Sequence, residues 1–255
     1  MSSNRPGRLS PSQQIAEDLR GEIRAGVLAE GEQLPSTAQL MERYGVAYQT
    51  ARQAIAALKA EGLVDSRTGS GVFVRRRPPL IRLGSGRYSR RIREGGQAPL
   101  QAEAETAGLD WRQEILELGI TPAPAWVAEW FGIEAGADTF VRRRRTWVED
   151  EPTQLADSYY LPEVVRGTLV TEENTGPGGS YARLEEAGHH IVHFREELEA
   201  RQPTPEEAGE IQLPSGVPVI ELHRIAFTAN GPLEVFRSVM AGNRHTFAYE
   251  FEAPE

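Results

Sequence analysis

The first 74 residues carry the signals of three short helices. Ser10 and Ser36 are each followed three residues later by a glutamine, which is the spacing of a capping box. Apolar residues then recur at helical spacing, and a glycine follows each apolar stretch, at Gly26, Gly45 and Gly62. These start and stop signals restrict the region to a small unit of three helices that begin near Pro11, Thr37 and Tyr48.

A β-hairpin is predicted directly after the third helix. Leu63-Val64 and Val72-Phe73-Val74 flank a glycine-rich turn at 67–71. Three helices followed by a hairpin make a winged helix-turn-helix, in which the short turn at 45–47 sets the second and third helices across one another. The third helix of such a domain enters the major groove of DNA with its N-terminal residues at the base edges. The alternative is a domain of the same shape that contacts only protein.

Charge is divided unevenly along the chain. Residues 1–93 hold sixteen Arg or Lys against eight Asp or Glu, whereas residues 94–255 hold twelve against twenty-nine. A basic first part indicates a nucleic acid or another anionic surface as its partner, although chance clustering gives the same count. There is no run of eighteen apolar residues and no signal peptide, so we expect a cytoplasmic protein without a membrane partner. The lack of cysteine excludes disulfides, thiolate metal sites and cysteine catalysis.

The stretch from Gln14 to Val74 resembles the DNA-binding domain of the GntR family of bacterial repressors. The resemblance rests on short stretches in the family's order: Gln14-Ile15-Ala16, Gly26-Val27-Leu28, Leu34-Pro35-Ser36, Gly45-Val46, Thr50-Ala51-Arg52, Glu61-Gly62-Leu63-Val64 and Gly69-Ser70-Gly71-Val72-Phe73-Val74. It implies a winged helix-turn-helix over residues 9–76 that binds double-stranded operator DNA. The chain departs from the family pattern at Thr37-Ala38 and Ala47-Tyr48. A tyrosine cannot make the forked bond to guanine that an arginine makes, so the family's operator sequence is not carried over.

Candidate DNA contacts follow from their places in this domain. The free amides at the start of the second helix can meet a phosphate. The first residues of the third helix face base edges, the residue one turn further reaches the backbone, and the wing approaches the phosphates. The candidates are Ser36 and Thr37 in the second helix, Tyr48, Gln49, Thr50 and Arg52 in the third, and Arg67, Gly69 and Ser70 in the wing.

The second part of the chain mixes strands and helices. Strand signals at 139–148 and 153–160 flank a turn at 149–152, and Asn230-Gly231 joins strands at 218–228 and 232–240. A further strand is predicted at 191–201, with helices at 181–187 and from Thr204. These elements predict an α+β fold with a mainly antiparallel sheet. Residues 77–94, which begin with two prolines and contain further arginines, are predicted to be a basic linker.

The order of strands and helices in the second part of the chain resembles that of the UTRA domain, the effector-binding domain of the HutC branch of the GntR family. The fold of the UTRA domain is similar to that of chorismate lyase. The matching stretches are Val141-Arg142-Arg143-Arg144, Glu151-Pro152, Ala156-Asp157-Ser158-Tyr159-Tyr160-Leu161-Pro162, 200–208, Gly216-Val217-Pro218-Val219 and Gly231-Pro232-Leu233-Glu234-Val235. The resemblance implies an effector-binding and dimerisation domain over residues 95–252. The expected partners are operator DNA, a small-molecule effector and a second copy of the chain.

Four consecutive arginines on one strand suggest an anion site. Alternate residues of a strand face the same side, so Arg142 and Arg144 share one face. An inward arginine needs an anion, which is either a carboxylate of the protein or a ligand. The resemblance implies that Arg144 binds an acidic ligand, opposite polar groups of the return strand and the later hairpin. The candidate effector-binding residues are Arg142, Arg144, Asp157, Ser158, Tyr160 and Glu234. An internal network of arginines and carboxylates is the alternative.

Signals for catalysis or metal binding are weak. His189, His190 and His193 lie at a helix end and a strand start with no cysteine beside them, and the glycine-rich stretch at 176–180 lacks the residues of a phosphate-binding loop. We therefore expect no metal, no cofactor and no enzyme activity. The predicted function is a ligand-responsive transcription repressor that binds a palindromic operator as a dimer. A ligand-binding or protein-interaction module without specific DNA binding, or a lyase-like enzyme, is the alternative.

Overall fold

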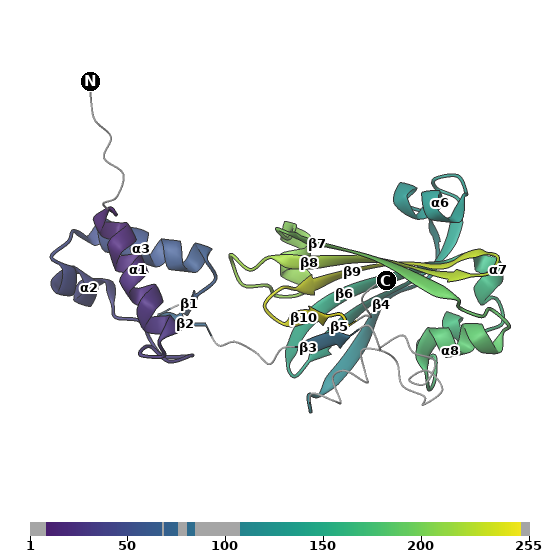
Figure 1. Cartoon of the computed structure of the whole chain (residues 1–255), viewed down its shortest axis with the longest axis horizontal. Helices are drawn as coiled ribbons and strands as arrows, with labels where there is room; N and C mark the ends of the chain where they lie inside the picture. Colours follow the sequence, from purple (N-terminus) through teal and green to yellow (C-terminus); the bar gives the residue numbers. More distant parts are fainter. Residues whose placement is uncertain (1–8, 68, 76–80, 85–107, 251–255) are drawn as a thin grey trace, which may run out of the picture. The chain divides into compact units, whose positions relative to one another are not determined.

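The computed structural model describes residues 9–67, 69–75, 81–84 and 108–250 of the 255-residue chain. The chain divides into two compact units, of which the first comprises residues 1–78 and 214–217 and the second the remainder. The first unit is helical with a two-stranded hairpin, and the second is built around a six-stranded sheet (Figure 1).

The three predicted helices of the first unit are confirmed. They are α1 (Pro11–Arg24), α2 (Thr37–Tyr44) and α3 (Tyr48–Ala60). Both capping boxes form, with Ser10 and Gln13 at the start of α1 and Ser36 and Gln39 at the start of α2. Gly45 ends α2 with a φ of 64°, a left-handed conformation that favours glycine. The core comes from one face of each helix and includes Ile15, Leu19, Leu40, Ala51 and Leu58.

The wing is the antiparallel pair β1 (Val64–Arg67) and β2 (Gly71–Val74). Gln33, which precedes α2, lies against this hairpin, and its Nε2 donates to the carbonyl of Ser70 at 2.8 Å. A Cβ on Gly71 would lie 2.4 Å from the same Nε2, and Gly71 also has a φ of 118°. Glycine at this position therefore allows the wing to pack closely on the segment before α2.

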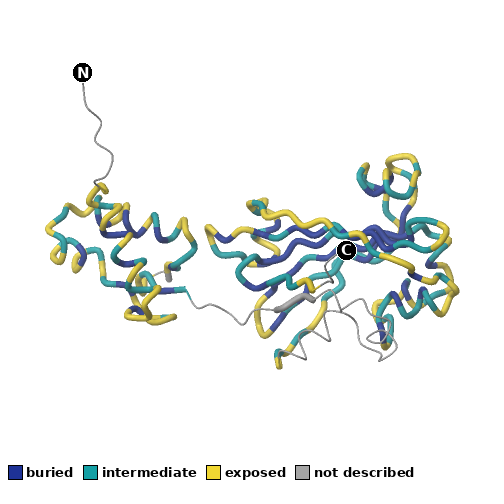
Figure 2. The backbone as a smooth tube through the Cα atoms, in the orientation of Figure 1, coloured by how far each residue is buried: buried dark blue, intermediate teal, exposed yellow. Residues whose placement is uncertain are grey.

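The second unit contains one antiparallel sheet of six strands in the order β4-β5-β6-β9-β8-β7. The strands are β4 (Trp111–Pro122), β5 (Asp138–Val148), β6 (Glu151–Tyr160), β7 (His193–Arg201), β8 (Val219–Thr228) and β9 (Gly231–Ala241). The predicted antiparallel architecture and both hairpins are confirmed. Burial is concentrated in the central strands (Figure 2), where β9 is buried over most of its length. The edge strand β4 was not predicted from the sequence.

Helices cover both faces of this sheet. On one face, α7 (Pro162–Val165), the 3-10 turn η2 (Leu169–Thr171) and α8 (Gly179–Glu186) pack on a cluster around Tyr160 and Phe140. On the other face, α6 (Ala125–Phe131) packs on Val141 and Val235, while the segment after α9 (Pro205–Glu210) packs on Val219 and Val239. Figure 1 shows α6 and α8 on opposite sides of the sheet.

A short parallel pair joins two distant segments. Strand β3 (Ile81–Gly84) pairs with β10 (His245–Ala248) near the end of the chain. The sequence places residues 81–84 in the basic linker, but these residues form a strand of the second unit. Ile81 and Leu83 alternate with Arg82, which is the spacing of a strand with one apolar face.

Candidate functional site

The N-terminus of α3 presents an exposed polar and aromatic surface. Tyr48 is 54% exposed, Gln49 and Arg52 are exposed, and Thr50 is half-buried. The guanidinium of Arg52 lies 5.7 Å from the centre of the Tyr48 ring, so the two side chains are neighbours one turn apart. Gln53, which was not predicted, is exposed four residues after Gln49 and extends the same surface.

The remaining candidate contacts of the first unit lie at the start of α2 and in the wing. The Ser36 hydroxyl accepts from the amide of Gln39 at 3.2 Å, so it caps α2, and Thr37 is half-buried. Gly69 and Ser70 are exposed at the wing tip, where Gly69 has a φ of 74°. Arg67 belongs to β1, and its side chain lies outside the described residues.

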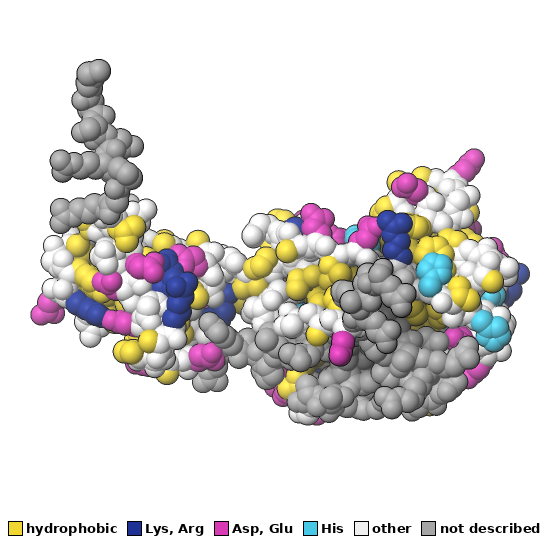
Figure 3. All heavy atoms as spheres, viewed as in Figure 1, with side chains coloured by type: hydrophobic (Ala, Val, Ile, Leu, Met, Phe, Trp, Pro, Cys, Tyr) yellow, Lys and Arg dark blue, Asp and Glu magenta, His cyan; other side chains and the backbone are white. Residues whose placement is uncertain are grey.

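Several arginines of the first unit are already paired with carboxylates. Arg43 bonds Glu22 at 2.5 Å, and Arg20 bonds Glu61 at 2.6 Å. Arg75 donates two bonds to Asp65, at 2.6 and 3.0 Å. In Figure 3 basic and acidic side chains are interspersed on the face of this unit in view. Among the described residues Arg52 has no carboxylate within 4.0 Å, so its charge is available to an outside anion.

The strand register gathers most of the predicted effector residues on one face of the sheet. Arg142 lies opposite Ser158, Arg144 opposite Ala156, and paired residues of antiparallel strands point to the same side. Nη2 of Arg144 donates to Oγ of Ser158 at 2.5 Å. Among the described residues no carboxylate lies within 4.0 Å of Arg144, and its buried Nε has no hydrogen-bond acceptor. The Arg144 guanidinium is thus held in place by Ser158, and its Nε–H group has no acceptor.

Arg142 is engaged with the main chain. Its side chain is 3% exposed and donates to the carbonyls of Val170 at 2.6 Å, Glu172, and Glu173 at 3.1 Å. Burial, with a smaller contribution from the neighbouring charge of Arg144, lowers the pKa of Arg142 to about 10. Arg142 therefore holds η2 and the two residues that follow it against β5, and its Nη atoms donate to carbonyls of the protein.

Glu234 lies at the centre of a buried hydrogen-bond network on the same face. Its Oε1 accepts from the Tyr160 hydroxyl at 2.8 Å, and its Oε2 accepts from Arg224 at 3.0 Å and from the Tyr181 hydroxyl. Burial opposes ionisation of Glu234, but Arg224, the two phenols and Arg144 outweigh it and hold the pKa below its usual value. Tyr181 and Arg224 were not predicted. On this face the buried arginine–carboxylate pair is Arg224 with Glu234. The internal network that the sequence left open for the arginine strand is formed on the other face, where Arg143 and Arg145 pair with carboxylates.

Asp157 is not brought together with the other predicted effector residues. It lies on the opposite face of β6 and accepts from Arg143 at 3.1 Å. Arg143 also bonds Glu117 at 2.8 Å. Because neighbouring residues of a strand point to opposite faces, Asp157 and Ser158 cannot form one wall.

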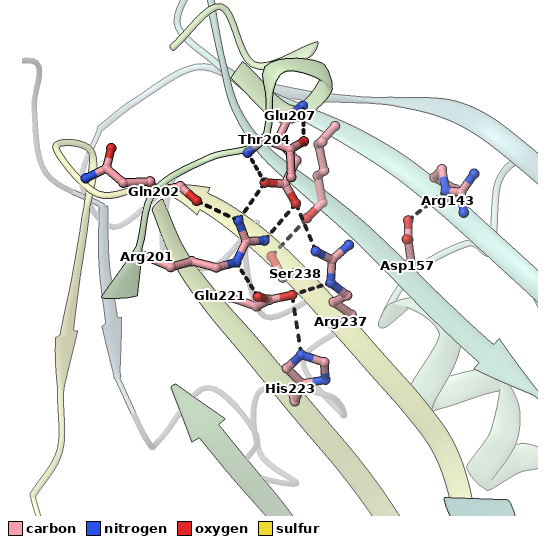
Figure 4. A network of polar contacts seen from close by, with 11 residues as sticks. Arg143, Asp157, Arg201, Gln202, Thr204, Glu207, Glu221, His223, Arg237 and Ser238 are labelled. Carbon is pink, nitrogen blue, oxygen red and sulfur yellow. Dashed lines mark hydrogen bonds and ion pairs between the residues drawn. The ribbon is translucent and has the colours of Figure 1, made fainter. Parts of the chain in front are cut away.

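The same opposite face carries a denser ion-pair network near α9 (Figure 4). Arg201 donates to both oxygens of Glu207 at 2.7 Å and to Glu221 at 2.5 Å, and Arg237 bonds Glu207 at 2.9 Å. These bonds attach α9 to β7, β8 and β9. The hydrogen bond from Arg201 lowers the pKa of Glu207 to about 2, although burial alone would raise it.

The histidines singled out in the sequence are not gathered into a metal site. His193 stacks on Phe227 with ring centres 4.4 Å apart. In the described ranges no three His, Asp or Glu side chains are grouped as a metal ion would require. No described helix is long and apolar enough to cross a membrane.

Each of the two units matches a known protein family. The family described as bacterial regulatory proteins, gntR family, matches residues 11–74, and the UTRA domain family matches residues 106–246. The chain belongs to the GntR family. It is 37% identical to the HTH-type transcriptional regulator SCO4628 of Streptomyces coelicolor, over 95% of this chain and 93% of that protein. It is 30% identical to the regulator Rv0792c of Mycobacterium tuberculosis, over 90% and 81% of the two chains.

Solved structures show the same two-domain fold. The crystal structure of a GntR-family transcriptional regulator has a TM-score of 0.70 and 27% identity, covering 96% of this chain and 98% of that one. PhnF from Mycobacterium smegmatis has a TM-score of 0.58 and 21% identity, covering 94% and 100%, and supports the fold alone. This GntR-family member is a helix-turn-helix transcriptional regulator with a UTRA effector domain.

Proposed function

We propose that this chain is a ligand-responsive repressor of the HutC branch. In this proposal a dimer binds a palindromic operator, and a small polar or acidic metabolite bound at Arg144 changes its affinity for DNA. The observation that carries the effector half is the Arg144 guanidinium, which Ser158 holds at 2.5 Å and which has no carboxylate of the described residues within 4.0 Å. A related protein, NagR of Bacillus subtilis, is a repressor by name and is 25% identical over 98% of both chains.

The DNA-binding half rests on the exposed start of α3. Tyr48, Gln49 and Arg52 project from the first turns of this helix, which in a winged helix-turn-helix enters the major groove. Arg52 supplies a charge without a carboxylate partner among the described residues, so it suits a phosphate. Because a two-fold dimer presents two such helices, its operator has two symmetric half-sites about 10 base pairs apart or a multiple of that spacing.

The effector acts through a difference in affinity. A ligand that binds better to one arrangement of the two DNA-binding units shifts the population toward that arrangement, typically by about 1–3 kcal/mol of coupling free energy. We propose that binding at Arg144 favours the arrangement with lower affinity for the operator.

The direct test is a DNase footprint of the full-length protein on the DNA that flanks its own gene, together with its mass in solution by light scattering. We expect dimers that protect two symmetric half-sites. A monomer without any protected sequence at low salt would contradict the proposal and favour the protein-interaction alternative.

A further inference from the structure

A second incompletely bonded polar group lies on the Arg144 face of the sheet. Gln154 is the residue of β6 opposite Thr146, one same-face position before Ala156, which lies opposite Arg144. Its side chain is 9% exposed, and its Oε1 has no donor among the described residues. A buried acceptor without a donor destabilises the folded protein. The unpartnered oxygen of Gln154 therefore requires an explanation.

The hydroxyl of Ser238 determines which way the Gln154 amide points. Ser238 Oγ donates its single hydrogen to the carbonyl of Leu155 at 3.0 Å. Ser238 must therefore act as the acceptor toward Gln154, whose Nε2 lies 2.7 Å away. With Nε2 fixed on Ser238, the atom left over is Oε1, and it can only accept.

The surroundings of Gln154 are partly apolar. Met240 lies opposite Gln154 on β9, and Ala156, Phe236 and Met240 belong to one buried apolar cluster. Arg144 and Ser158 lie beyond Ala156 along the same face. The order along β6 on this face is thus a cation at Arg144, buried apolar side chains and an acceptor at Gln154.

We propose that the effector carries an anionic group for Arg144 and a hydrogen-bond donor, a hydroxyl or an ammonium group, for Oε1 of Gln154. The inference rests on the proposed effector function and narrows it to the class of hydroxy acids and amino acids. A plain carboxylate or inorganic phosphate ion fills only the Arg144 end of this site. Gln154 is then a residue that determines ligand specificity.

The first test needs no ligand and uses the thermal unfolding of the full-length chain. Gln154→Met removes the unpartnered oxygen together with the Nε2–Ser238 hydrogen bond at similar volume, so we expect the Tm to fall by no more than about 4 °C, as the loss of one hydrogen bond would cause. Gln202→Met makes the same change at an exposed position between β7 and α9 and is the matched control. A fall in Tm for Gln154→Met that is larger than the loss of this one bond explains would mean that Oε1 also holds a donor of the protein itself, which contradicts the proposal.

The second test uses calorimetric titration with sets of acids that differ in the donor: propionate, lactate and alanine; succinate, malate and aspartate; hexanoate and gluconate. In at least one set we expect the donor-bearing acid to bind the wild type about tenfold or more tightly than its parent. The preference should shrink to less than about threefold in Gln154→Met and persist in Gln202→Met.

The outcomes separate this inference from the proposed function. A preference that survives in Gln154→Met contradicts the role of Gln154, as does a wild type that binds parent and donor-bearing acids equally. Binding of none of these acids contradicts the ligand class. The operator footprint is measured independently, and its absence would instead contradict the proposed function.

Discussion

The Arg144 side chain leans along the sheet toward Ser158. The strand register places Arg144 opposite Ala156, yet its Nη2 donates to Ser158 Oγ, at 2.5 Å, one same-face position away. This bond fixes the direction of a cation that has no carboxylate partner among the described residues. A ligand anion therefore meets a guanidinium that is already oriented, which reduces the entropy lost on binding.

Replacement of Ser158 tests this orientation. Ser158→Ala removes the acceptor but leaves the charge, so we expect the apparent affinity for the effector to fall about 3- to 30-fold while operator affinity is unchanged. The readout is the effector concentration that half-dissociates the protein–operator complex, measured by fluorescence anisotropy. An unchanged half-dissociation concentration would show that the bond to Ser158 does not orient Arg144 for the ligand.

The buried hydrogen bonds of Arg142 predict that its replacement destabilises the folded protein. Arg142→Met leaves three main-chain carbonyls without their donor, and we expect the free energy of unfolding to fall by about 2–4 kcal/mol. Urea denaturation followed by tryptophan fluorescence measures this change. Arg143→Met removes a half-exposed arginine from the opposite face and should cost about 1 kcal/mol or less. Equal effects of the two variants would argue against a special role for Arg142.

The exposed charge of Arg52 predicts that its replacement changes how DNA affinity depends on salt concentration. If Arg52 contacts one phosphate, Arg52→Ala should weaken binding to all DNA sequences and reduce the slope of log affinity against log salt by about one. Arg43→Ala is the control, because Arg43 is paired with Glu22 within the unit and should leave the slope unchanged. Titrations of operator and unrelated duplex at several salt concentrations give both slopes. A slope unaffected by Arg52→Ala would remove this residue from the interface.

The lowered pKa of Glu207 predicts how the stability of the folded protein depends on pH. Its pKa is about 2 in the folded protein and roughly 4.3 in an unfolded chain, so the unfolded state binds the proton more readily. The stabilisation is therefore complete above about pH 5 and is lost as the pH falls toward 2, with an upper bound of roughly 3 kcal/mol.

Glu207→Gln should accordingly be less stable than the wild type at pH 7 and approach it at pH 2. Urea titrations across this pH range measure the difference. Glu210→Gln, in which the replaced carboxylate is 47% exposed, is the control and should run parallel to the wild type. A constant gap between Glu207→Gln and the wild type at all pH values would contradict the assignment of this pKa.

Local signals in the sequence predicted much of the fold. The capping boxes, the glycine stops and the Asn230-Gly231 turn each act within a few residues, and all three are present in the structure. Strand β4 was missed because its sequence, with Glu-Ile-Leu-Glu-Leu at its centre, lacks the alternation of a strand with one buried face. Its strand conformation is fixed by pairing with β5.

The effector site was predictable only in part. Alternation along β5 correctly put Arg142 and Arg144 on one face, and the same rule, applied to β6, would have separated Asp157 from Ser158. Tyr181 and Arg224 could not be found in this way, because α8 and β8 reach Glu234 only through the packing of the whole domain. The hydrogen bonds from Arg142 to carbonyls of η2 and of the residues that follow it depend on the same long-range packing.

The most direct test of the central claim compares wild type with Arg144→Ala in a footprint on the DNA that flanks the gene. Both proteins are measured with and without the small-molecule fraction of an extract from the source cells. We predict equal protection of the operator without extract, and loss of protection with extract for the wild type only. Loss of protection in both proteins, or in neither, would contradict a regulator that senses its ligand through Arg144.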